Sequence, residues 1–179
     1  MAGISLADAR WVLSGQIEDT SRFLGGLHLL APQGAFLFVE GGSHPPELRS
    51  FLEARQVNAS PRPALGTLWP RHAYYSLPAT QEILGEMARL TASLAEPEIC
   101  HHVHVFVGDN VLLEGHDAFG YKFYVSGLVP EQRLKEFCAE VGCGYESVSE
   151  SDEPTGGEKG QANNQMQRTG AAQAMDARR

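Results

Sequence analysis

The segment from 102 to 116 constrains the fold more than any other part of the chain, because its side chains alternate between apolar and polar. The apolar positions are Val103, Val105, Val107, Val111 and Leu113. A period of two is the side-chain period of a β-strand, and the intervening Gly, Asp and Asn residues suit a tight turn. The segment therefore predicts a β-hairpin with one apolar face.

The register of this hairpin follows from burial. A three-residue loop between Val107 and Val111 is expected, because it keeps the apolar side chains of both strands on one face. It places these two valines opposite each other and Val105 opposite Leu113. A two-residue loop would instead pair Val105 with Glu114 and mix the apolar and polar faces.

The same register gathers four candidate ligands on the other face of the hairpin, the histidine face. His104 lies opposite Glu114, and His102 lies opposite His116, with Cβ atoms about 5 Å apart across the strands. Such a square predicts a metal site for zinc, iron or manganese, with Glu114 as ligand or general base of a metal-dependent hydrolase. The alternatives are a metal-free His–Glu pair for proton transfer, and a solvated face whose histidines perform no chemistry.

The next strand, expected over 121–126, determines what lies beside the histidine face. A four-residue turn before it would place Tyr121 and Phe123 on that face and cover the histidines with aromatic rings. A turn of three or five residues would instead bring Lys122 and Tyr124 there. A lysine at that position would disfavour a bound cation by charge repulsion.

Periodicity and turn residues predict the other elements. An apolar stripe of Ile83, Met87, Leu90 and Leu94 predicts a helix over 80–94. Prolines at the start predict helices after Pro46 and from Pro130, the second ending at Gly142. Apolar runs predict further strands over 35–40, 72–77 and 145–148, whereas 5–15 and 20–30 fit no single pattern.

The order of these elements is β-α-β-α-β-β-β-α, which predicts an α+β domain over residues 1–148. We expect a mostly antiparallel sheet with three or so helices packed on one face. From 149 to 179 the chain has no apolar periodicity and is rich in Gln, Asn, Gly, Ser and Ala. A segment of this composition buries too little apolar surface to offset the entropy of ordering, so we expect a disordered tail.

Composition and charge limit the classes of partner. The formal net charge of −8, without a basic patch, argues against nucleic acid and favours a protein partner with a basic surface, or a small ligand. The chain has neither a signal-like start nor a run of about 18 apolar residues, so a membrane association is not expected.

The three cysteines are an odd number without a disulfide or zinc-finger spacing, which favours a reduced, cytoplasmic setting. Cys138 lies on the apolar stripe of the last helix and is expected in the core. Cys143 lies between two glycines and is expected to be the more exposed thiol.

No sequence signature of a known catalytic site is present. We therefore expect a small acidic binding or interaction protein rather than an enzyme, and no cofactor. The alternative is the metal-dependent hydrolase, with zinc or another divalent transition metal held by His102, His104, His116 and Glu114.

Overall fold

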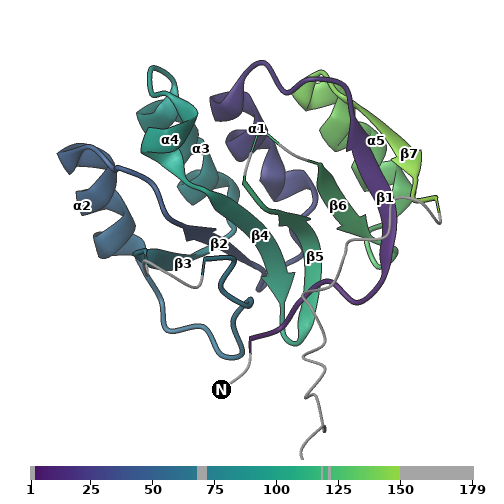
Figure 1. Cartoon of the computed structure of the whole chain (residues 1–179), viewed down its shortest axis with the longest axis horizontal. Coiled ribbons are helices and arrows are strands. Elements are labelled where there is room, and N and C mark those ends of the chain that lie inside the picture. Colours follow the sequence, from purple (N-terminus) through teal and green to yellow (C-terminus); the bar gives the residue numbers. More distant parts are fainter. Residues whose placement is uncertain (1–2, 68–71, 118, 121, 150–179) are drawn as a thin grey trace, which may run out of the picture.

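An antiparallel sheet of seven strands forms the centre of the computed structural model, which describes residues 3–67, 72–117, 119–120 and 122–149 (Figure 1). The strand order across the sheet is β3-β2-β4-β5-β6-β1-β7. The strands are β1 (Ala9–Ser14), β2 (Phe36–Glu40), β3 (Tyr74–Pro78), β4 (His102–Val107), β5 (Asn110–Gly115), β6 (Phe123–Ser126) and β7 (Gly144–Ser147). The predicted α+β class and antiparallel sheet are confirmed.

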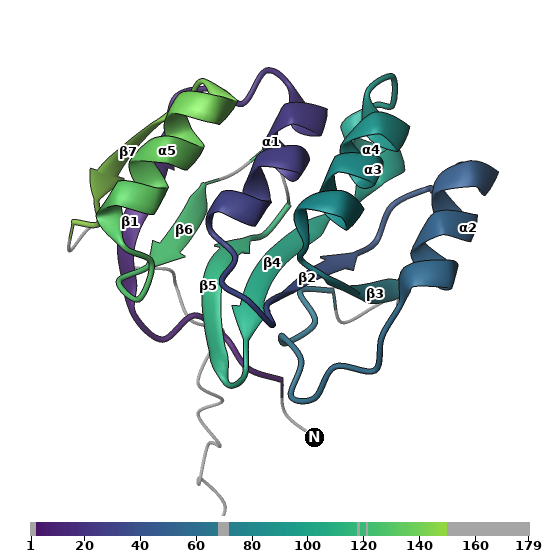
Figure 2. The same cartoon turned by 180° about the vertical axis from the view of Figure 1, so that it is seen from behind.

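The helices lie together on one side of this sheet, the helix face (Figures 1 and 2). They are α1 (Thr20–Gly26), α2 (Pro46–Arg55), α3 (Gln81–Thr91), α4 (Glu96–Ile99) and α5 (Glu131–Val141), with a short 3₁₀ helix at Leu27–Leu29. The three helices that the sequence predicts correspond to α2, α3 and α5. None of the described helices is long and apolar enough to cross a membrane.

The ends of α3 and α5 follow from their sequence. The Thr80 side chain caps α3 by accepting a hydrogen bond from the amide of Ile83. Gly142 ends α5 with a φ of +82°, a conformation that is strained for residues with a Cβ. Met87 and Phe137 are fully buried in the main core between the helices and the sheet.

Strand β1 comes from the segment that has no clear pattern in the sequence. Trp11, Val12 and Leu13 are all buried, so the period of two that normally reveals a strand is absent. The segment is a strand because β6 and β7 pair with it on both sides. Its secondary structure is thus decided by strands more than 100 residues away in the sequence.

The predicted three-residue hairpin loop is wrong, although it gives the right pairing further from the turn. Val107 pairs with Asn110, so the loop has two residues, and a β-bulge follows in which Leu112 is the extra residue. Beyond the bulge Val105 faces Leu113, as predicted. The bulge removes the mismatch that a two-residue loop would otherwise cause, because it shifts the register of β5 by one residue.

The face of the sheet opposite the helices has a small apolar cluster of its own. Its buried members are Phe38, Phe106 and Val111. Ile4 and Leu6 of the N-terminal segment pack on them, as do Ala59 and Leu65 of the connector after α2. Ile4 ties the two covering segments together, because its amide donates to the carbonyl of Arg62 at 2.9 Å.

The predicted tail over 149–179 lies outside the described residues except for Ser149.

Gly115 provides a test of how closely β5 and β6 pack. A Cβ at this position would overlap the ring of Phe123, which is buried in the main core. We expect Gly115→Ala to lower the free energy of unfolding by about 1–3 kcal/mol, because a packed ring has to move. Urea unfolding measures this change.

The matched control is Gly85→Ala on the exposed side of α3, where nothing lies within 4 Å of the new Cβ. Alanine there should stabilise the protein by about 0.5–1 kcal/mol, because it favours the helix. Equal effects of the two substitutions would contradict the packing of Phe123 on Gly115.

Candidate functional site

The histidine face of the sheet carries two rows of side chains that run across neighbouring strands. In the first row, Phe38 of β2 pairs with His104 of β4, and His104 pairs with Glu114 of β5. In the second row, Glu40 of β2 pairs with His102 of β4. The predicted pairing of His104 with Glu114 is therefore confirmed, and the rows continue onto β2.

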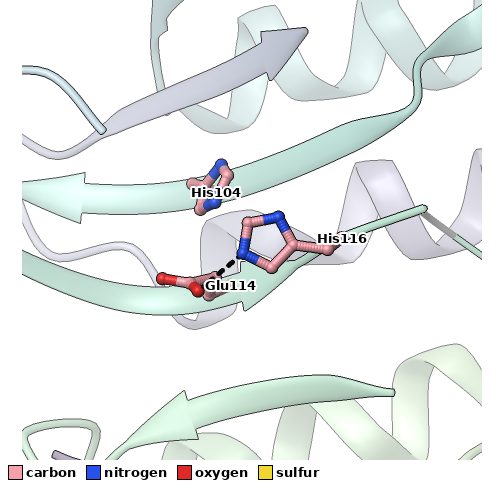
Figure 3. A group of neighbouring side chains, drawn as sticks. All are labelled: His104, Glu114 and His116. Carbon is pink, nitrogen blue, oxygen red and sulfur yellow. Dashed lines mark hydrogen bonds and ion pairs between the residues drawn. The ribbon is translucent and has the colours of Figure 1, made fainter. Parts of the chain in front are cut away.

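Three of the four predicted ligands come together: His104, Glu114 and His116. One potential ligand atom from each lies within 4.8 Å of the others (Figure 3). The ring of His116 folds back over the strand, so that its Nε2 lies 2.8 Å from Oε1 of Glu114. The ring centroids of His104 and His116 are 5.3 Å apart.

Glu114 is held in place from two sides. Its Oε1 is hydrogen-bonded to Nε2 of His116, and its Oε2 accepts a hydrogen bond from the amide of Leu6 at 2.8 Å. Burial disfavours the charged carboxylate, but these two hydrogen bonds outweigh the burial, so the pKa of Glu114 lies below its usual value. The carboxylate is therefore ionised at neutral pH, and the N-terminal segment fixes its position.

His104 is a neutral imidazole at neutral pH. Its side chain is only 2% exposed, and this burial lowers its pKa to about 3 against the opposing charge of Glu114. Its Nδ1 has no hydrogen-bond partner among the described residues, which is uncommon for a buried polar atom. A neutral imidazole is the form that binds a metal ion.

His116 completes the group on its solvent side. Its side chain is 49% exposed, and the hydrogen bond to Glu114 raises its pKa. A group with one buried, one half-buried and one exposed member has one side open to solvent. The group therefore has a solvent-exposed edge at His116 and a carboxylate charge at Glu114.

His102 lies beside this group, but its ring nitrogens already have hydrogen-bond partners. Its Nδ1 accepts a hydrogen bond from the amide of Asp117 at 3.2 Å, which leaves the proton on Nε2. Nε2 then donates to Oγ1 of Thr67 at 3.0 Å. Both ring nitrogens have protein partners, so the geometry gathers three of the predicted ligands and gives His102 a separate role.

A loop of the connector closes over His102. A Cβ at Gly66 would lie 2.6 Å from Nε2 of His102, so the backbone passes directly against the ring. The carboxylate of Glu40, only 1% exposed, accepts hydrogen bonds from the amides of Gly66 and Thr67. Glu40 thus anchors the loop that holds His102.

The sequence analysis did not identify Glu40 as part of this region. The available signal was a carboxylate at the end of a strand that is otherwise apolar, Phe36–Glu40. A buried carboxylate needs hydrogen-bond donors, and here it finds them in a backbone loop 26 residues away.

In the neighbouring strand β6, Tyr124 has the position predicted for a turn of three or five residues, on the histidine face. Tyr124 pairs with Glu114 and so lies on the histidine face, whereas Phe123 and Val125 are buried in the main core. Phe123 therefore does not cover the histidines. Tyr121 lies outside the described residues, and Lys122 is exposed.

The predicted solvated outer face is wrong for the middle of the hairpin, because His102 and His104 are both buried. That prediction assumes that other segments cover only the helix face of the sheet. In the structure the N-terminal segment and the connector form a partial second cover.

A separate pocket of about 590 Å³ lies between α2, the connector and the edge strand β3. Tyr74, Ser76 and Arg62 are among the residues that line it, and the guanidinium of Arg62 lies 4.3 Å from the ring centroid of Tyr74. None of the four predicted ligands lines this pocket.

Comparisons with protein-family models, with curated proteins and with solved structures found no match to this chain.

The buried neutral state of His104 predicts a pH dependence of stability in the metal-free protein. Between pH 3 and about 6.5 the unfolded chain binds a proton at His104 that the folded protein excludes. Linkage then requires the free energy of unfolding to fall as the pH is lowered through this range, by at most about 1.4 kcal/mol per pH unit from this residue.

His104→Gln isolates this contribution, because glutamine does not titrate. We expect urea unfolding between pH 4 and 7 to show a shallower pH dependence for the variant than for the wild type. Equal slopes would contradict a depressed pKa of His104.

Proposed function

We propose that the protein binds a divalent transition-metal ion through His104, Glu114 and His116. The observation that carries the proposal is the convergence of three potential ligand atoms within 4.8 Å, one of them on a buried neutral imidazole. In a tetrahedral zinc site with bonds of about 2.0–2.1 Å, neighbouring ligand atoms lie about 3.4 Å apart. Nε2 of His116 and Oε1 of Glu114, at 2.8 Å, are already closer than this, so binding requires that pair to separate slightly and any pair near the 4.8 Å limit to approach by about 1.4 Å.

The donor set favours zinc, iron or manganese over calcium or magnesium. Two imidazole nitrogens and one carboxylate suit borderline transition metals, whereas calcium and magnesium prefer sites made of oxygen atoms. The net charge of −8 also raises the local concentration of cations near the surface. This makes the protein a binding protein for a small cation, whereas the sequence connects a metal only with the hydrolase alternative.

Metal binding competes with the existing contact between Glu114 and His116. The hydrogen bond at 2.8 Å satisfies both side chains when His116 is protonated, so the metal has to displace that proton. Where His116 is an imidazolium, binding releases a proton, so the affinity for the metal weakens as the pH falls.

Titration of zinc into chelator-treated protein tests the proposal. Calorimetry should give one site per chain, and His116→Ala and Glu114→Gln should each weaken binding about tenfold or more, because each removes a ligand. His28→Ala is the matched control: this histidine hydrogen-bonds the carbonyl of Gly25 on α1, on the helix face, and its loss should leave the affinity unchanged.

His102→Gln separates the three-ligand site from the four-ligand site that the sequence predicts. Unchanged affinity supports three ligands, and a loss as large as that of His116→Ala supports four. The whole proposal is wrong if the wild type shows no saturable zinc binding, or if His116→Ala binds as tightly as the wild type.

Hydrolysis is a second candidate function, favoured by the number of ligands. Catalytic zinc sites have three protein ligands and leave a position for water, whereas structural sites have four. The exposed side of His116 is where such a water would lie. Zinc-loaded protein should then hydrolyse an activated ester such as 4-nitrophenyl acetate, at a rate that follows zinc occupancy and is lost in His116→Ala. A rate no higher than that of free zinc would exclude hydrolysis of this ester while leaving the binding proposal intact.

A further inference from the structure

A pair of cysteines lies at the end of α5 and is separate from the histidine face. Cys138 is on the buried side of the helix, and Cys143 follows the glycine that ends it. The two residues are five positions apart in sequence. The distance between the two side chains depends on the path of the chain after the helix.

The helix ends in a turn that brings these two residues together. The amides of Gly142 and Cys143 both donate to the carbonyl of Cys138, at 2.8 and 3.1 Å. The longer-range bond, across five residues, defines a Schellman motif, in which the side chains at its two ends commonly touch. In such a turn the Cα atoms at the two ends lie roughly 5–6 Å apart, within the range that a disulfide spans.

The thiol of Cys138 donates a weak hydrogen bond to the carbonyl of Gly144 at 3.7 Å, so it faces the segment that carries Cys143. The interaction between the neighbouring thiols lowers the pKa of Cys143, because it stabilises the thiolate there, and raises the pKa of Cys138. The negative end of the helix dipole opposes a thiolate at this position, so the lowering depends on Cys138. Cys143 is also the more exposed of the two, whereas Cys138 is 5% exposed.

Cys100 provides an internal comparison. It is 2% exposed, and burial raises its pKa to about 12. A thiol in that state is protonated and shielded from reagents. Cys143 therefore differs from Cys100 in both the ionisation and the exposure of its thiol.

We propose that Cys143 and Cys138 form an oxidative modification site, at which a peroxide converts the two thiols into a disulfide. The thiolate of Cys143 attacks one peroxide oxygen, the O–O bond breaks, and Cys143 becomes a sulfenic acid while the other oxygen leaves as hydroxide and takes up a proton to give the first water. The sulfur of Cys138 then attacks the sulfur of Cys143, the S–O bond breaks, and the hydroxyl leaves as water with the proton of Cys138. In sum, two thiols and one hydrogen peroxide give one disulfide and two waters.

Protease mapping after peroxide treatment tests the site. Reduced protein is exposed to hydrogen peroxide at equal concentration, the remaining thiols are blocked with N-ethylmaleimide, and the products are analysed by mass spectrometry. Trypsin leaves both cysteines in one peptide, 136–159, which should be lighter by about 2 Da and carry no maleimide. Cleavage at Glu140 separates the two cysteines unless a disulfide joins them.

Three variants distinguish the roles. Cys138→Ser should accumulate a sulfenic acid at Cys143 that dimedone traps, and Cys143→Ser should form no disulfide at Cys138. Cys100→Ser should behave as the wild type. The proposal is overturned if Cys138 and Cys143 both remain open to maleimide in the treated wild type, or if Cys143 proceeds to sulfinic acid without a disulfide. It is also overturned if Cys143 reacts no faster than Cys100.

Discussion

The pairing of β2, β4 and β5 sets the positions of His104 and Glu114, and the β-bulge at Leu112 sets the register of β5 against β4. The bulge lets a two-residue turn join the strands while Leu113 and Val105 still share the helix face. Because side chains alternate along a strand, the same shift places Glu114 opposite His104 on the other face. A single extra residue in β5 thus keeps Leu113 in the main core and places Glu114 beside His104 on the other face.

The chemistry of that group depends on a second, smaller layer of structure. Ile4 and Leu6 pack over Phe38 and Phe106, and the same segment supplies the amide that holds Glu114. Burial by this layer keeps His104 neutral, while His116 stays at the solvent edge. The cover therefore produces a group with one neutral, one anionic and one exposed member, which suits a cation better than an open sheet face would.

The sequence predicts the candidate site in part. The alternation around Val103 and Val105 gives the pairing of His104 with Glu114, because burial leaves few registers open. It does not reveal that His102 is occupied by Thr67 and the amide of Asp117, since both partners belong to irregular segments. The hydrogen bond from the amide of Cys143 to the carbonyl of Cys138 is equally hidden, because it depends on the turn at Gly142. The basic protein partner and the cytoplasmic setting stay predictions.

The sequence by itself determined the α+β class and the three main helices, because these depend on periodicity and on local signals such as Thr80 and Gly142. It determined the apolar side of the hairpin in part, because Val105 and Leu113 lie in the main core while Val111 lies on the histidine face. Only the tertiary structure decided that Trp11–Leu13 is a strand and that the histidine face is partly covered. Strand pairing and burial by distant segments are long-range contacts. They depend on which surfaces meet once the chain has folded, so the local sequence pattern does not predict them.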